Sequence, residues 1–365
     1  MNFRLGELFC GAGGLGIGAK NAKITKDKKT YKITHTWAND YDKDACETYR
    51  NNVGRENVIC CDVAKLDMLK LPPVDALAFG FPCNDFSDVG EKKGFNGSYG
   101  QLYQYCIKAL KLFQPKWFLA ENVGGLRNAN DGKAFQVILQ ELIEAGYNIV
   151  PNLYKFEKYG VPQSRHRIII VGIRNDLNLS FKVPAPLTTP PITCKDAITK
   201  PPIPDSAKNQ ERTNQAKQVI ERLQCIKEGE NVFTANMPEH LRLKVGGAKI
   251  SQIYKRLDSS KPAYTVTGSG GGGTHMYHWE ENRALTNREK ARLQTFPDTF
   301  TFSGSKESVR RQVGMAVPPK GAQVVFEAIL KTFAGIEYKQ VQPNISPILF
   351  SFIQSRLVEQ QQIIL

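Results

Sequence analysis

The sequence predicts an α/β fold with a mostly parallel sheet, together with a second, smaller domain that is rich in loops. In the first half of the chain, short apolar runs alternate with helical patterns, which is typical of a parallel sheet wrapped by helices. From about residue 182 to residue 208 prolines cluster and the alternation ends, which indicates a domain boundary. With 365 residues, 41% of them hydrophobic, the chain can bury one large core and a smaller one.

The elements of the first half follow from the spacing of the apolar residues. Strands are predicted at residues 4–9, 34–39, 76–80, 117–121 and 167–172. Helices are predicted between them, at residues 42–52, 100–113 and 132–145. Another helix is predicted after Pro318 and Pro319, through about residue 333, because proline fits the first turn of a helix.

The charge balance favours a polyanionic partner. Lysine and arginine number 49 against 35 aspartates and glutamates, which gives a formal net charge of +14. The cations are spread along the chain, in pairs such as Lys255-Arg256 and Arg310-Arg311. We therefore expect a folded basic surface rather than a charged tail.

The eight cysteines favour a reducing compartment. They include no C-x-x-C spacing, so neither a zinc site nor a disulfide framework is expected, and we predict no bound metal. Met1 is not followed by an apolar signal core, and no stretch of about 18 apolar residues occurs later. These features predict a cytoplasmic protein that does not enter a membrane.

A glycine turn follows the first predicted strand and opens a helix, at residues 7–15 (ELFCGAGGL). Glycines there let the backbone approach a dinucleotide or S-adenosylmethionine, although a simple tight turn has the same pattern. Asp40 lies at the end of the second strand, where a carboxylate can accept both hydroxyls of a ribose. Asp62 could accept an adenine amino hydrogen, and either residue alone is more often a cap or a surface residue.

Three further motifs carry candidate catalytic groups. Cys83, in residues 80–87 (GFPCNDFS), lies just past a strand end, at the rim where α/β proteins hold their chemistry. A single cysteine is more often buried and inert. Glu121 ends another strand, while Arg165 and Arg167 lead into the next one. A carboxylate and an arginine at adjacent strand ends usually form an ion pair, but with Cys83 they indicate a different kind of site.

Taken together, these motifs resemble the DNA cytosine-C5 methyltransferase family of the prokaryotic restriction-modification type, in the family's linear order. Further matches lie at residues 100–103, 283–298 and 312–319. The resemblance implies a Rossmann-like fold that binds S-adenosyl-L-methionine. It also implies transfer of a methyl group to C5 of a flipped cytosine in double-stranded DNA, and a companion restriction endonuclease that acts on the same site.

The resemblance assigns the site residue by residue. Cys83 would be the nucleophile at cytosine C6, and Glu121 would hold the ring at N3 and its amino group. Arg165 and Arg167 would support O2, the thiolate and a nearby phosphate. Because charge develops on N3 and O2 during the attack, Glu121 needs a raised pKa to act as a donor. The residues implied in cofactor binding are Phe9, Gly11, Gly13, Gly14, Asp40 on the ribose, Asp62 on the adenine, Pro82, Leu102, Met315 and Ala316.

The resemblance also divides the chain and shows two departures from the family. Residues 1–181 would be the catalytic and cofactor-binding domain, residues 182–300 the target-recognition domain, residues 301–335 a return to the catalytic domain and residues 336–365 an extension of unknown role. Asn84 replaces a usual glutamine, and its amide keeps both a donor and an acceptor. Met315 replaces a usual asparagine and cannot make the same hydrogen bonds.

Three other functions fit parts of the sequence. A tRNA cytosine methyltransferase would use the same catalytic set, but the long insert between Arg174 and Arg283 favours a module that reads duplex DNA. A DNA-binding relative without activity would have no need of the intact Cys83. A nicotinamide-dependent dehydrogenase would leave the Pro-Cys and Glu-Asn-Val motifs without a role. The recognition sequence itself cannot be read from the chain.

Overall fold

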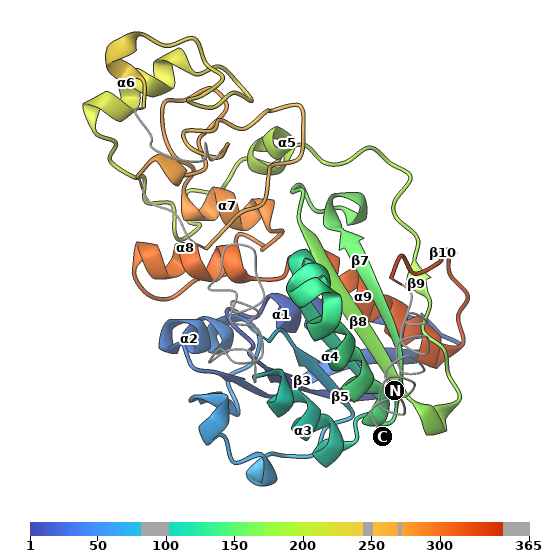
Figure 1. The fold of residues 1–365 in the computed structure, drawn as a ribbon. Coiled ribbons are helices and arrows are strands. Elements are labelled where there is room, and N and C mark those ends of the chain that lie inside the picture. The colour runs from blue at the N-terminus through green and yellow to red at the C-terminus, as the bar shows by residue number, and fades with distance from the viewer. Residues whose placement is uncertain (82–101, 244–250, 269–271, 346–365) are drawn as a thin grey trace, which may run out of the picture.

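The computed structural model describes residues 1–81, 102–243, 251–268 and 272–345 (Figure 1). One eight-stranded sheet organises the larger part, with the strand order β2-β3-β1-β5-β6-β8-β7 and with β4 paired to β3. Its strands are β1 Asn2–Leu8, β2 Lys23–Lys26, β3 Lys29–Asp40, β4 Val58–Cys60, β5 Ala76–Phe79, β6 Trp117–Val123, β7 Tyr147–Lys155 and β8 His166–Arg174. The centre, β3-β1-β5-β6, is parallel, which confirms the predicted fold class.

Strands β7 and β8 form the antiparallel part of this mostly parallel sheet. β8 runs antiparallel to β6 and to β7, and β7 was not predicted from the sequence. Gly146, with a φ of 98°, turns the chain directly from the preceding helix into β7. β7 lies at the sheet edge and contains Pro151, a residue that edge strands tolerate but that hides the strand in the sequence pattern.

Helices cover both faces of the sheet because its inner strands are apolar on both sides. The four residues of β5 are all buried, as expected for a strand packed on two faces. One face is covered by α3 Tyr103–Phe113 and α4 Lys133–Glu144, and the other by α1 Gly14–Asn21 and α9 Pro319–Ala334. The remaining helix of this part is α2 Lys43–Asn52. The predicted helix after Pro318 is confirmed as α9, with Pro319 at its first position.

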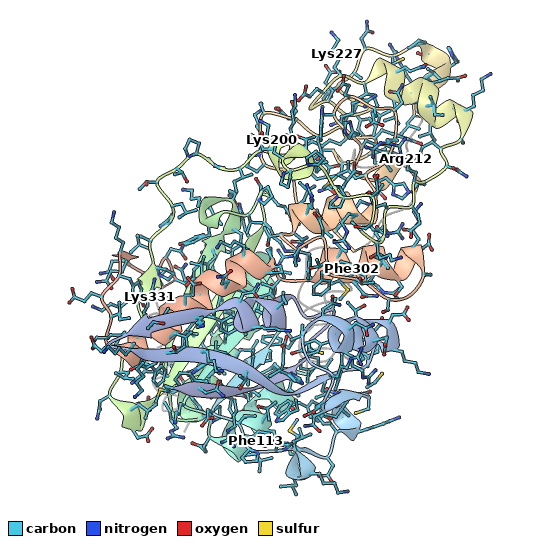
Figure 2. All side chains as sticks on the ribbon, turned by 180° about the vertical axis from the view of Figure 1, so that it is seen from behind. Phe113, Lys200, Arg212, Lys227, Phe302 and Lys331 are labelled. Carbon is cyan, nitrogen blue, oxygen red and sulfur yellow. The ribbon has the colours of Figure 1, made fainter. Side chains whose placement is uncertain are left out.

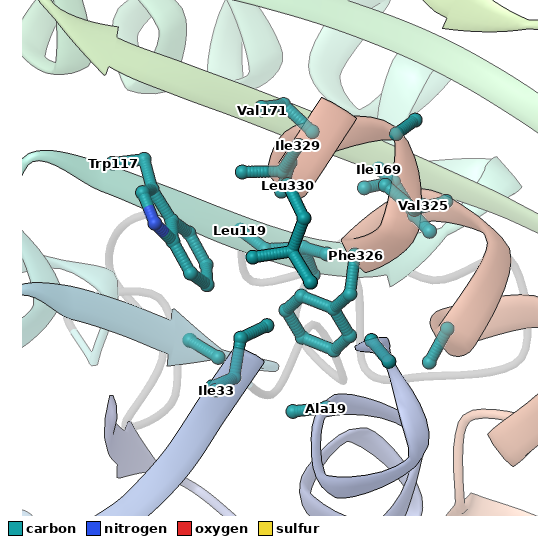
Figure 3. Close-up of a cluster of buried hydrophobic side chains, with 14 of the residues drawn as sticks. Ala19, Ile33, Trp117, Leu119, Ile169, Val171, Val325, Phe326, Ile329 and Leu330 are labelled. Atoms are coloured by element: carbon teal, nitrogen blue, oxygen red, sulfur yellow. The ribbon is translucent and has the colours of Figure 1, made fainter. Parts of the chain in front are cut away.

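The core between α9 and the sheet shows how this layer is held together. Leu119 and Ile169 project from β6 and β8, and they meet Phe326 and Ile329 of α9 (Figure 3). All four side chains are fully buried, at 0% exposure. Burial of each such side chain stabilises the fold by roughly 1.5 to 3 kcal/mol, so this face fixes the strand ends that carry the site.

A second lobe lies beyond one edge of the first and contains α5 and α6 and long loops, with α7 and α8 between the two lobes (Figure 1). The helices of the second lobe include α5 Cys194–Thr199 and α6 Lys217–Cys225, and those between the lobes are α7 Asn287–Leu293 and α8 Lys306–Met315. A short pairing of β9 Val183–Pro184 with β10 Gln340–Val341 brings the chain after α9 back to the start of this region. The domain boundaries at residues 181, 300 and 335 remain predictions.

Cationic side chains lie on both lobes. Lys200, Arg212 and Lys227 lie on the second lobe, and Lys331 projects from α9 (Figure 2). In the described ranges no helix is long and apolar enough to cross a membrane. The same part of the chain holds no group of three His, Cys, Asp or Glu residues placed to bind a metal ion.

Candidate active site

The glycine turn between β1 and α1 has the backbone that its residues predict. Gly11 and Gly13 adopt positive φ angles of 50° and 91°, and Phe9 adopts one of 54°. The Gly11 N–H donates to Oδ2 of Asp40 at 2.8 Å. A Cβ added to Gly11 would meet no atom within 4 Å, so the turn faces open space beside a carboxylate. This geometry fits a ligand whose hydroxyl groups donate to Asp40.

Asp40 is held from two sides at the carboxyl end of β3. Its Oδ1 accepts from the N–H of Asp42 at 3.0 Å, while Oδ2 accepts from Gly11. Burial raises the pKa of Asp40, and the two backbone N–H donors oppose that rise. The pairing of β1 with β3 therefore brings the glycine turn and Asp40 together, although they lie far apart in the sequence.

The turn before α9 packs against the start of α1. A side chain at Gly14 would overlap the backbone of Val317, and one at Gly18 would lie 2.7 Å from the Cβ of Ala322. The neighbouring Met315 ends α8 and is 69% exposed, and Ala316 caps that helix. The structure thus places Val317, two residues after Met315, against the glycine turn, and the Met315 side chain lies largely in solvent.

The other predicted cofactor residues lie at the same edge of the sheet or beyond the described residues. Asp62 is exposed, and its Oδ1 accepts from the Ala64 N–H at 2.9 Å. Leu102 is partly buried against the core under α3 and α4. Pro82 lies outside the described residues. Tyr41 directly follows Asp40 at the carboxyl end of β3, and its side chain is 70% exposed.

Glu121 and Arg167 form a nearly buried ion pair on the adjacent strands β6 and β8. Arg167 Nε lies 3.0 Å from Glu121 Oε1, and their side chains are 13% and 12% exposed. Burial raises the pKa of Glu121, and the charges of Arg167 and Arg165 oppose that rise. A Cβ on Gly80 would lie 3.3 Å from Glu121 Oε2, so the end of β5 lies directly beside this carboxyl group.

Cys83 and Asn84 lie outside the described residues. Phe81, two residues before Cys83, is held by a hydrogen bond from the next strand. Asn122, next to Glu121 and 5% exposed, donates from Nδ2 to the carbonyl of Phe81 at 3.0 Å. This bond ties the backbone that precedes Cys83 to the strand that carries Glu121. Sequence reasoning quoted Asn122 as part of a motif but gave it no role.

Arg165 is buried and connects the two lobes. Its Nη1 donates to the carbonyl of Val266 at 2.9 Å and its Nη2 to the carbonyl of Gly314 at 3.0 Å. Burial lowers the pKa of Arg165, and its Nε has no hydrogen-bond partner among the described residues. The terminal nitrogens of Arg165 therefore bind backbone, while Arg167 is the arginine that pairs with Glu121.

A second buried connection uses two glutamines that sequence reasoning did not single out. Gln163 accepts from the N–H of Val266 at 2.8 Å and donates to Oε1 of Gln294 at 3.0 Å. Gln294 in turn donates to the carbonyl of Val313 at 2.7 Å. Both glutamine side chains are fully buried. The segment that enters β8 is thereby joined to the second lobe and to α8, which holds the arginines in a fixed place.

Solved structures share the fold described above. One is described as a prophage-encoded DNA modification methyltransferase of E. coli, with a TM-score of 0.70 and 24% identity over 91% of this chain and 99% of that one. Another is the Entamoeba histolytica methyltransferase EhMeth, with a TM-score of 0.64 and 14% identity over 92% of this chain and 99% of that one. This chain therefore has the fold of these methyltransferases, an α/β fold with a mostly parallel sheet.

The chain belongs to the C-5 cytosine-specific DNA methylase family, which matches residues 3–331. It is 54% identical to the type II methyltransferase M.BbvI of Brevibacillus brevis, over 93% of this chain and 94% of that protein. It is 37% identical to the type II methyltransferase M.NgoFVII of Neisseria gonorrhoeae, over 98% of this chain and 91% of that protein. The family predicted from the motifs is thus confirmed, and the enzyme is a DNA (cytosine-5) methyltransferase.

Proposed function

We propose that this enzyme methylates C5 of a cytosine that is flipped out of double-stranded DNA, through a covalent bond between Cys83 Sγ and cytosine C6. The observation that carries the proposal is the buried pair of Glu121 and Arg167 beside Gly80, three residues before Cys83. A carboxyl group with a raised pKa and a fixed cation are the groups needed next to a cytosine ring under nucleophilic attack.

The chemistry explains why a nucleophile is needed. C5 of cytosine is too weak a nucleophile to take the methyl group directly. When the Cys83 thiolate bonds to C6, the C5–C6 double bond becomes an enamine with electron density at C5. C5 then takes the methyl group. A base next removes the C5 proton, the double bond re-forms and the thiolate leaves.

Glu121 and Arg167 stabilise the charge that appears on the ring. In the protonated state that burial favours, Glu121 donates toward N3 as negative charge develops there, and the amino group of the base donates to its other oxygen. Arg167, held 3.0 Å from Glu121, is placed as a fixed cation for O2. Arg165 acts mainly as the buried support that keeps this edge of β8 in position.

The residues at the glycine turn fit S-adenosylmethionine, which supplies an electrophilic methyl group when bound. Asp40 would accept the ribose hydroxyls, and Asp62, exposed at the same sheet edge, would accept from the adenine amino group. Phe9, Gly11, Gly13 and Gly14 would form the floor of the site, with Leu102, Met315 and Ala316 at its sides.

Flipping a cytosine out of a duplex costs a few kcal/mol, and contacts from both lobes must offset this cost. We propose that the loops of residues 182–300 read base edges, while lysines and arginines hold the phosphate backbone. Because the relatives are type II methyltransferases, we also propose that the enzyme protects its site from a companion restriction endonuclease.

Duplex DNA with 5-fluorocytosine at the target position tests the covalent step. Attack at C6 and methyl transfer can proceed on this base, but the C5 fluorine cannot leave as a proton does, so the enzyme stays bonded. With S-adenosylmethionine present, the denatured mixture should contain an adduct with the mass of protein plus methylated DNA.

Two variants identify the nucleophile in that experiment. Cys83→Ala should form no adduct. Cys225→Ala, which removes a partly exposed thiol from α6 in the second lobe, should form it at the wild-type rate. An adduct that persists in Cys83→Ala would overturn the assignment.

A further inference from the structure

A polar cavity lies between α7, α8 and the second lobe, and none of the residues assigned to catalysis lines it among the described residues. Lys290 of α7, Arg310 of α8 and His275 line it together, and the hydroxyl-bearing Thr267 and Thr274 belong to the same lining. Among the described residues that line this cavity there is no aspartate or glutamate. The cavity therefore gathers positive charge and hydrogen-bond donors without a matching anion.

Lys290 is buried, and Arg310 and His275, which line the cavity with it, are partly buried. Lys290 is only 6% exposed, and burial, followed by the charges of Arg310 and Lys306, lowers its pKa to about 8. Within the described chain, Arg310 Nε and His275 Nδ1 are buried without a hydrogen-bond partner. Buried cations are costly unless an anion or several hydrogen bonds compensate them.

The nearest acidic groups do not supply this compensation. Glu289, next to Lys290 in the chain, is held by Arg283 in two contacts of 2.8 Å and also caps the start of α7. Glu307, which faces His275 from α8, is exposed to solvent. Neither Glu289 nor Glu307 lines the cavity, so neither is placed there to neutralise Lys290 and Arg310.

The cavity lies next to the segment that enters the catalytic strand β8, because Thr265, which lines it, donates from its hydroxyl to the carbonyl of Ser164 at 2.7 Å. Val266 also lines it, and the Val266 carbonyl accepts the hydrogen bond from Arg165 at 2.9 Å. An anion bound there would lie on the second lobe, beside the segment that contacts the catalytic edge of the sheet. On a protein of net charge +14 that acts on DNA, the anion that must approach this region is a backbone phosphate.

We propose that Lys290, Arg310 and His275 form a binding site for one phosphodiester of the DNA backbone. The inference rests on the proposed function, since it takes duplex DNA as the substrate. Lys290 supplies a charge with three donors and Arg310 its guanidinium N–H groups, while neutral His275 donates one N–H. This site adds a fixed point of attachment between the backbone and the second lobe, next to the loops proposed to read base edges.

The test pairs a protein change with a DNA change. Bisulfite sequencing first locates the methylated site, and duplexes carrying that site are then made with a neutral methylphosphonate at one backbone position at a time. Affinity is measured for the wild type, Lys290→Met and Arg310→Gln. At one position the methylphosphonate should weaken wild-type binding about tenfold and weaken the two variants by less than about twofold.

Lys23→Met is the matched control, because it removes an equal charge from the exposed edge strand β2. At every backbone position, the methylphosphonate should weaken DNA binding by Lys23→Met as much as it weakens binding by the wild type. If the loss of DNA affinity caused by Lys290→Met or Arg310→Gln simply adds to the loss caused by the methylphosphonate at every backbone position, the assignment of the site is wrong. Wild-type protein that does not methylate duplex DNA would overturn the proposed function, and this site with it.

Thermal unfolding without DNA separates a folding defect from lost recognition. Lys290→Met should unfold at the wild-type temperature or above it, because it removes a buried charge without a counter-ion. Inorganic phosphate is added as the free-anion probe. If it stabilises wild type but not Lys290→Met, while the methylphosphonate losses are additive, the cavity binds a free anion and the DNA assignment is wrong.

Discussion

The hydroxyl of Tyr49 donates to Oε2 of Glu7 at 2.9 Å, directly beneath the glycine turn. Glu7 is the last residue but one of β1, is 1% exposed, and its Oε1 has no partner among the described residues. Burial raises the pKa of Glu7 to about 8, and the bond from Tyr49 opposes the rise. A neutral carboxyl group therefore supports the turn at physiological pH.

This carboxyl group should make the protein less stable as pH rises from about 4.5 to about 8. In this window the unfolded chain, with an ordinary glutamate pKa of 4.5, releases the proton that folded Glu7 keeps. The contribution to stability is complete below pH 4.5 and is lost as pH approaches 8. Between pH 5.5 and 7.5 the wild type should lose about 1 kcal/mol of unfolding free energy per pH unit through Glu7, and Glu7→Gln should not show this loss. Urea unfolding at pH 5.5, 6.5 and 7.5 measures both slopes. Equal slopes in wild type and variant would contradict the assignment.

Glu121→Gln should lower the rate of methyl transfer by about 10² to 10⁴ while leaving DNA binding largely intact. The amide keeps the shape of the side chain but cannot give up a proton. In the wild type the protonated carboxyl is the active form, so the rate should fall as pH rises through the raised pKa of Glu121. Single-turnover transfer of a labelled methyl group measures both effects. A Glu121→Gln enzyme with the wild-type rate would exclude the proposed role.

Arg165→Met should destabilise the fold by about 2 to 3 kcal/mol. The change leaves the buried carbonyls of Val266 and Gly314 without their donors. Chemical denaturation measures the loss, and Arg55→Met, which alters an exposed arginine, should change stability by less than about 0.5 kcal/mol. If Arg165→Met abolishes activity at unchanged stability, the arginine acts on the substrate rather than as a support.

Met315→Asn should change the affinity for S-adenosylmethionine by about tenfold or less. Met315 is 69% exposed, so an asparagine there would hydrogen-bond largely with water, and a new bond to the cofactor would add only about 0.5 to 1.5 kcal/mol. Titration calorimetry measures the change. A thousandfold gain in affinity would show that Met315 severely weakens cofactor binding in the wild type.

The central strands could be predicted because local sequence encodes them. Short continuous apolar runs bounded by turn residues, such as β5, are typical of buried strands, and polar residues placed just after parallel strands meet at one edge of the sheet. The pairing of Glu121 with Arg167 could not be predicted, because it requires β8 to run antiparallel to β6. The antiparallel direction of β8 could not be predicted, because it depends on β7, whose Pro151 and polar neighbours give no clear strand pattern.

The environment of Arg165 and the helix α7 also escaped prediction, for a related reason. Every residue of α7 is buried, including Arg288 and Lys290, so this helix has no polar face to reveal it in the sequence. The sequence pattern likewise predicts that Arg165 is a solvent-exposed charged residue next to Arg167. Burial of such residues depends on contacts between distant segments, which one-dimensional patterns do not contain.

The close packing of Gly14 and Gly18 against Val317 and Ala322 has a consequence for the protein while it is being synthesised. The glycine turn is synthesised well before the surface on which it rests, because Gly14 and Gly18 precede Val317 and Ala322 in the chain. A growing chain that has not yet reached Ala322 therefore lacks a finished turn, whichever strands have already paired. The packing of the turn must wait for the start of α9 to be translated.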